Sequence, residues 1–100
     1  MFKPVCSVEE LRDSTPFHFS ENGRDYILIK LGNEIFALDG ICTHEYAELW
    51  NGFVTEDVLT CPLHLSQFDV RTGEVVTPPA EKPLRKYSVK VEHGRVYVDI

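Results

Sequence analysis

Basic residues are few in this 100-residue chain. Ten lysines and arginines stand against sixteen aspartates and glutamates, which gives a formal net charge of −6 at pH 7. A nucleic-acid carrier needs a basic patch to neutralise phosphates, so this class of protein is excluded. An acidic protein instead meets basic patches on protein partners, where charge acts mostly on the rate of encounter.

Long hydrophobic runs are also missing. The N-terminal segment Met1–Cys6 has no apolar region of the kind found in signal peptides, and no stretch approaches the length that spans a membrane. We therefore expect a soluble cytoplasmic protein with no membrane association.

Cysteine is scarce, and its count of three is odd. Cys42 and Cys61 each stand close to a histidine, which leaves only Cys6 outside such a pair. An intramolecular disulfide could form only by taking a cysteine out of a Cys–His pair. We therefore expect no disulfide framework, and we expect the protein to work in a reducing compartment. Cys6 itself is predicted to be a small buried hydrophobic residue.

Helical periodicity is almost absent. The one candidate is about a single turn at 7–11, where Ser7 and Glu10 have the spacing of a capping box. Elsewhere, short apolar segments alternate with turn residues, which predicts an all-β fold, either an antiparallel sandwich or a small barrel. The expected strands are 17–19, 26–29, 34–38, 58–60, 67–70, 75–76 and a C-terminal hairpin over 87–100.

One domain, 1–100, is expected from this length. Between about 41 and 79 the predicted strands become shorter and the Cys–His pairs appear. We interpret 41–79 as a subdomain inserted into the sandwich.

The two Cys–His pairs read Cys42-Thr43-His44 and Cys61-Pro62-Leu63-His64, with sixteen residues between them. Each pair offers one thiolate and one imidazole. A two-iron cluster with two different irons needs this interleaving, because one iron takes both cysteines and the other takes both histidines. A zinc site made of the same residues is an alternative, although classical zinc fingers keep their cysteines together at one end. Two buried cysteines and two unrelated surface histidines are the other alternative.

Together with the segment Phe68–Glu74 and the dipeptide Pro78-Pro79, these motifs resemble Rieske [2Fe–2S] ferredoxins. The resemblance is greatest to the ferredoxin components of bacterial multicomponent aromatic-ring dioxygenases, and it covers essentially the whole chain. It implies a Rieske-type antiparallel sandwich with a small inserted cluster-binding subdomain. It also implies a proline loop over the cluster, formed by Pro78 and Pro79.

The resemblance implies a [2Fe–2S] cluster with Cys42 and Cys61 on one iron and His44 and His64 on the other. The implied function is one-electron transfer, without a catalytic site, from a flavin-containing ferredoxin reductase to a terminal oxygenase. We expect the carrier to be a monomer. A small Rieske-like subunit of a nitrite reductase is an alternative, but such chains often lack the ligands that this sequence keeps.

The departures from the family concern the surroundings of the cluster. Ala47 and Leu63 stand where respiratory Rieske proteins carry a bridging disulfide. Ser66 occupies the position of a serine that donates a hydrogen bond to sulfur in those relatives, but Phe68 replaces a tyrosine that does the same. Fewer donors destabilise the reduced state, so we expect a reduction potential of about −150 to 0 mV. Glu45 is a bulky acid where a small residue is common.

The remaining candidates are treated as structural. His18 and His93 are expected to face solvent or a local partner. Tyr46, Leu49 and Trp50 follow the first pair, and they either pack the subdomain or form an exposed docking surface.

Overall fold

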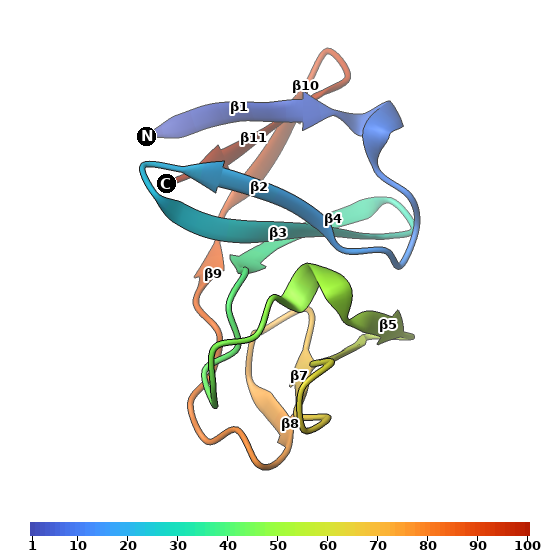
Figure 1. Cartoon of the computed structure of the whole chain (residues 1–100). Helices are drawn as coiled ribbons and strands as arrows, with labels where there is room; N and C mark the ends of the chain where they lie inside the picture. The colour runs from blue at the N-terminus through green and yellow to red at the C-terminus, as the bar shows by residue number, and fades with distance from the viewer.

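The computed structural model describes all residues, 1–100, and contains β-strands, two short 3-10 helices and no α-helix. The strands form three antiparallel sheets (Figure 1). The predicted all-β fold is therefore confirmed, as a sandwich rather than a barrel. In chain order the elements are β1 (Phe2–Ser7), η1 (Val8–Glu10), β2 (Phe17–Glu21), β3 (Arg24–Leu31), β4 (Glu34–Asp39), η2 (Leu49–Asn51), β5 (Phe53–Thr55), β6 (Val58–Thr60), β7 (Gln67–Asp69), β8 (Val75–Thr77), β9 (Lys86–Tyr87), β10 (Val89–Glu92) and β11 (Arg95–Asp99).

The sheet β2-β3-β4-β9 is the middle layer of the molecule. Side chains alternate along a strand, so β3 sends Leu28 towards the outer sheet β1-β11-β10 and Ile27 and Ile29 towards the sheet β5-β6-β7-β8. All three side chains are fully buried. A strand covered on both faces reads as a continuous apolar run, which explains the unbroken hydrophobic segment at 26–29.

Tight turns join neighbouring strands. Asn22 and Gly23 connect β2 to β3 with φ angles of 52° and 78°, and His93 and Gly94 connect β10 to β11 with 52° and 76°. Two successive residues with positive φ give a turn whose twist matches that of the flanking strands. The expected single turn near the N-terminus is also present, and the Ser7 N–H donates to a Glu10 carboxylate oxygen over 2.8 Å.

The C-terminal hairpin differs from the prediction in one respect. The segment expected as one strand from Tyr87 is broken at Ser88, because β9 pairs with β4 in the middle sheet and β10 pairs with β11 in the outer sheet. The Tyr87 hydroxyl donates to Asp39 Oδ1 over 2.5 Å and holds β9 on the middle sheet. The chain therefore crosses from one layer to the next within this segment.

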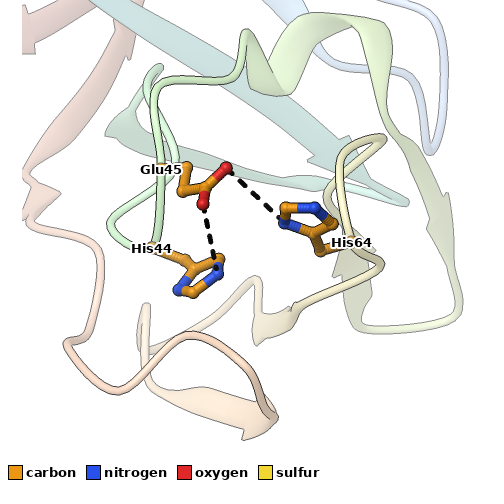
Figure 2. Close-up of side chains that lie close together, drawn as sticks. All are labelled: His44, Glu45 and His64. Atoms are coloured by element: carbon orange, nitrogen blue, oxygen red, sulfur yellow. Dashed lines mark ion pairs between the residues drawn. The ribbon is translucent and has the colours of Figure 1, made fainter.

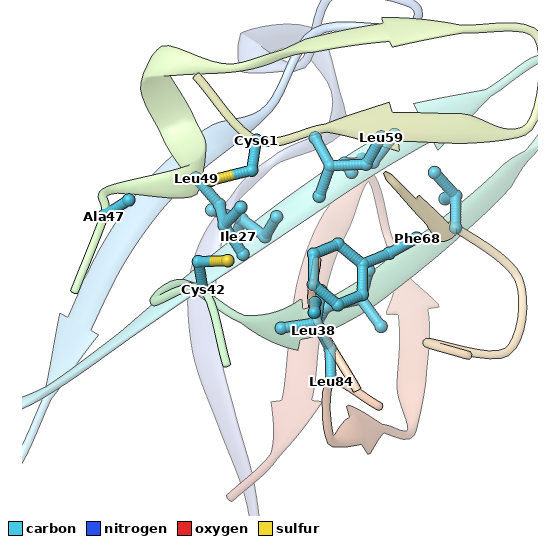
Figure 3. Packing of buried hydrophobic residues seen from close by; sticks show 12 residues of the cluster. Ile27, Leu38, Cys42, Ala47, Leu49, Leu59, Cys61, Phe68 and Leu84 are labelled. Atoms are coloured by element: carbon cyan, nitrogen blue, oxygen red, sulfur yellow. The ribbon is translucent and has the colours of Figure 1, made fainter. Parts of the chain in front are cut away.

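The third sheet, β5-β6-β7-β8, lies within 41–79 and packs against the middle sheet through a shared apolar core. Figure 3 shows this core from close by. The expected buried position of Cys6 is confirmed in the other core, between the middle and outer sheets. Neither helix could cross a membrane, since each is one turn of three residues.

Candidate metal centre

Two loops of similar construction carry the Cys–His pairs. We call 42–47 the first Cys–His loop and 61–66 the second. The Cys42 N–H donates to the Ala47 carbonyl over 3.0 Å, and the Cys61 N–H donates to the Ser66 carbonyl over 2.8 Å. Each loop is therefore closed by a bond from its cysteine to the residue five positions later. This closure turns both histidines back towards the same end of the molecule.

The second loop turns sharply at its tip. His64 and Leu65 adopt φ angles of 65° and 60°, a conformation that residues other than glycine rarely take. The second loop leaves β6 at Cys61, and the end of β6 lies against Gly52, the residue that follows η2. A Cβ at Gly52 would lie 2.2 Å from the Thr60 carbonyl oxygen, so only glycine permits this close approach.

The two cysteines lie inside the protein. Cys42 is 6% exposed and Cys61 is fully buried, and both belong to the core that contains Leu49 (Figure 3). Burial raises the pKa of the Cys61 thiol to about 11; the Leu63 backbone N–H opposes this rise, and the neighbouring Cys42 adds to it. The Cys61 thiol therefore stays neutral on its own, and a bound metal would displace its proton.

The two histidines lie at the surface. The side chains of His44 and His64 are 31% and 49% exposed, and their ring centroids are 5.6 Å apart. Figure 2 shows the Glu45 carboxylate between them, with one oxygen 4.0 Å from His44 Nε2 and the other 3.6 Å from His64 Nδ1. Sulfur donors therefore face inwards and nitrogen donors face outwards.

A third loop, 78–82, closes over the first two. The Ala80 N–H donates to Ser66 Oγ over 3.0 Å, and Thr43 Oγ1 donates to the Lys82 carbonyl over 2.6 Å. Pro79 and His44 both line a cavity of about 260 Å³ beside this loop. The proline loop expected from the sequence is therefore beside the Cys–His loops.

The residues present fit a two-iron cluster. A cluster of this kind needs two thiolates and two imidazoles on opposite sides, which the buried cysteines and surface histidines provide. Ser66 adds a second observation. Its oxygen accepts the Ala80 N–H, but its own O–H has no acceptor within the protein, although the side chain is fully buried. A buried donor without a partner is costly, and a cluster sulfur would satisfy it.

The residues that depart from the family pattern, and those that follow the first Cys–His pair, are partly in the core and partly at the surface. The three cysteines are unpaired, so no disulfide bridges the two loops. At the positions where respiratory Rieske proteins have that bridge, Ala47 is buried and Leu63 is partly exposed. Phe68 is fully buried in the core. Leu49 is fully buried, so it belongs to the packing, whereas Tyr46 is mostly exposed.

Two contacts of the site had no signal in the sequence. Neither the Thr43 bond to the Lys82 carbonyl nor the placement of Glu45 between two imidazoles follows from residue spacing. Both depend on how three separate loops meet in space, and a strand-and-turn pattern does not contain that information.

Known proteins resemble this chain along its whole length. The model of the Rieske [2Fe-2S] domain matches residues 1–88. The biphenyl dioxygenase ferredoxin subunit of Pseudomonas sp. (strain KKS102) is 34% identical over 99 residues, covering 98% of this chain and 91% of the relative. The naphthalene 1,2-dioxygenase ferredoxin component of Pseudomonas aeruginosa is 37% identical over 96 residues, covering 96% and 92%.

Solved structures of known proteins also resemble this chain. A chain in a complex of reduced oxygenase and oxidized ferredoxin in carbazole 1,9a-dioxygenase superimposes with a TM-score of 0.93 at 30% identity, covering 97% of this chain and all of that one. A protein of Mycobacterium tuberculosis described as a "putative NADH-dependent nitrite reductase small subunit", at 17% identity and a TM-score of 0.86, shares the fold. The cofactor is a Rieske-type [2Fe–2S] cluster, and the zinc alternative is set aside. The chain belongs to the Rieske [2Fe-2S] domain family.

Proposed function

We propose that this chain is the ferredoxin component of an aromatic-ring dioxygenase system. It takes single electrons from a flavin-containing reductase and passes them to a terminal oxygenase. The relatives named as ferredoxin components of biphenyl and naphthalene dioxygenases support this assignment. The observation that carries it is the separation of two buried thiols from two surface imidazoles within one pair of matched loops.

We base the ligand assignment on that separation. Cys42 and Cys61 would hold an inner iron, and His44 and His64 would hold an outer one. When bound, the cluster supplies a site that gains or loses one electron at a time. Neutral imidazoles on the outer iron remove two negative charges compared with four thiolates, which makes reduction easier than in ferredoxins with four cysteine ligands.

The protein shields the cysteine side of the cluster site from water and leaves its histidine side open. The core around Leu49 and Leu59 excludes water from the cysteine side, because both side chains are fully buried. The loop 78–82 limits access from the flank through its bonds to Ser66 and Thr43. Only the histidine side is left open to solvent. We therefore assign 41–79 as the cluster-binding subdomain of a single domain, 1–100.

The partner surface is the exposed end around the histidines. Leu65, which is 60% exposed, and the partly exposed Leu63 flank His64. Tyr46 is exposed within the first Cys–His loop. A small apolar surface of this kind suits a transient encounter, because a shuttle must leave as readily as it arrives. We propose that reductase and oxygenase both meet this end, and that the carrier is a cytoplasmic monomer.

The test starts with purified protein reconstituted anaerobically with iron and sulfide. We expect a coloured protein with two irons and two acid-labile sulfides per chain and a Rieske-type EPR signal on reduction. The His64→Ala variant should lose that signal, while His93→Ala, which changes an exposed histidine in the distant β10–β11 turn, should keep it. A normal signal in His64→Ala would refute the ligand assignment, and colourless protein with bound zinc would refute the function.

A further inference from the structure

An aromatic contact joins the middle sheet to the polypeptide that follows the first Cys–His loop. The rings of His18, on β2, and Trp50, on η2, are stacked with centroids 3.7 Å apart and an interplanar angle of 19°. The function described above does not use either residue. Trp50 is the only tryptophan of the chain, and it packs against the core that contains both Cys42 and Cys61.

Besides stacking on Trp50, the His18 ring is held by a polar contact with Asp25. His18 Nε2 lies 2.8 Å from Asp25 Oδ1, and the Ser20 hydroxyl donates to the same oxygen over 2.8 Å. The hydrogen bonds from His18 and Ser20 lower the pKa of Asp25, so the carboxylate is ionised at neutral pH. The ring is therefore held between a charged acceptor and the indole.

These three polar residues do not form a hydrolytic relay. In a serine–histidine–aspartate triad, serine and aspartate contact opposite nitrogens of the imidazole. Here the nearest approach of Ser20 to the ring, 3.4 Å, is to the same Nε2 that faces Asp25. The arrangement orients the ring and does not activate the hydroxyl.

Helix η2 connects the stacked tryptophan to both Cys–His loops. The Leu49 N–H donates to the Gly40 carbonyl over 2.9 Å, which joins the segments that precede and follow the first Cys–His loop. At the other end of η2, Gly52 approaches the Thr60 carbonyl, one residue before Cys61. A shift of Trp50 would therefore move the supports of both loops.

We propose that His18 is a positioning residue for the cluster: stacked on Trp50 and oriented by Asp25, it fixes η2 and so the spacing of the two Cys–His loops. This inference rests on the proposed function, because it concerns the same cluster. The stack lies outside the backbone pairing of the sheets, since β2 is an edge strand whose only partner is β3. It is a side-chain connection between the edge of the middle sheet and the cluster-binding loops.

The experiment measures the rate at which cluster-loaded protein loses its visible absorbance in the presence of an iron chelator. His18→Ala and Trp50→Leu should each accelerate the loss roughly two- to twelvefold, the range given by the worth of one aromatic pair. The double variant should be no faster than the faster single variant, because both remove the same contact. His18→Phe, which keeps a ring for stacking, should restore most of the wild-type rate, and His93→Ala should not change it.

The outcomes separate the two claims. A wild-type protein without a Rieske EPR signal defeats the proposed function and this inference with it. A wild-type protein with the signal, whose rate of cluster loss matches that of His18→Ala, defeats the inference alone. Additive effects in the double variant, or no rescue by His18→Phe, would also overturn it.

Discussion

Replacing Ser66 by alanine should lower the reduction potential of the cluster. The Ser66 side chain is fully buried, its oxygen accepts the Ala80 N–H over 3.0 Å, and its O–H has no protein acceptor. A sulfur of the bound cluster would accept from that O–H, and such a bond is stronger when the cluster carries the extra negative charge of the reduced state. Its removal therefore penalises reduction.

The size of the shift follows from the strength of one hydrogen bond. If the bond favours the reduced state by about 1–2 kcal/mol, then a one-electron couple shifts by roughly 40–90 mV, since a tenfold change in equilibrium constant is about 59 mV. The Ala80 N–H also loses its acceptor in a buried position, which should lower the free energy of unfolding by about 1–3 kcal/mol.

Redox titration of the purified protein, followed by EPR or visible absorbance, measures the potential. Thr60→Val is the matched control, because the Thr60 hydroxyl is also buried and its oxygen also accepts one hydrogen bond, from Gln67 Nε2 over 3.2 Å, but the residue lies on β6 and not in a Cys–His loop. The control should lose stability and keep its potential. An unchanged potential in Ser66→Ala, or an equal drop in both variants, would refute the reasoning.

Three further predictions concern the wild-type reduction potential, the core beside the cysteines and the Asp25 carboxylate. The wild-type potential should lie at about −150 to 0 mV, and redox titration giving a value above about +200 mV would contradict the effect assigned to Phe68. Leu59→Ala removes a fully buried side chain from the core shared with the cysteines, so chemical denaturation should show a loss of about 2–5 kcal/mol. The pKa of Asp25 is lowered chiefly by its bond from His18, so its contribution to stability is present above the ordinary carboxyl pKa and is lost as pH falls through the lowered value. Asp25→Asn should flatten the acid limb of the stability–pH curve, and a curve identical to that of the wild type would contradict this.

The strands and the Cys–His pairs could be predicted from the sequence because each has a local signal. In the C-terminal hairpin, alternation along the strand puts Val96 and Val98 on one face, and both side chains are fully buried. The interleaved order of cysteine and histidine predicted a mixed ligand set, and the structure places the thiols inside and the imidazoles outside. Such signals depend only on residues near one another in the chain.

Other features could not be predicted because they depend on where separate segments meet. Alternation over 87–92 gives the two faces of a strand but not the sheet to which each part belongs, so the break at Ser88 had no signal. The N-terminal strand β1 was not singled out either, because Pro4 interrupts its pattern. That proline is tolerated because β1 is an edge strand with an irregularity between Pro4 and Cys6.

The middle sheet has a consequence for how this chain can evolve. Ile27 and Leu28 are consecutive in β3 but contribute to different cores, one beneath the cluster-binding loops and one beneath the outer sheet. An insertion of one residue in β3, or a register slip of one position, would exchange the contents of both cores at once. Insertions should therefore be tolerated in the exposed turns at either end of this strand and strongly selected against within it.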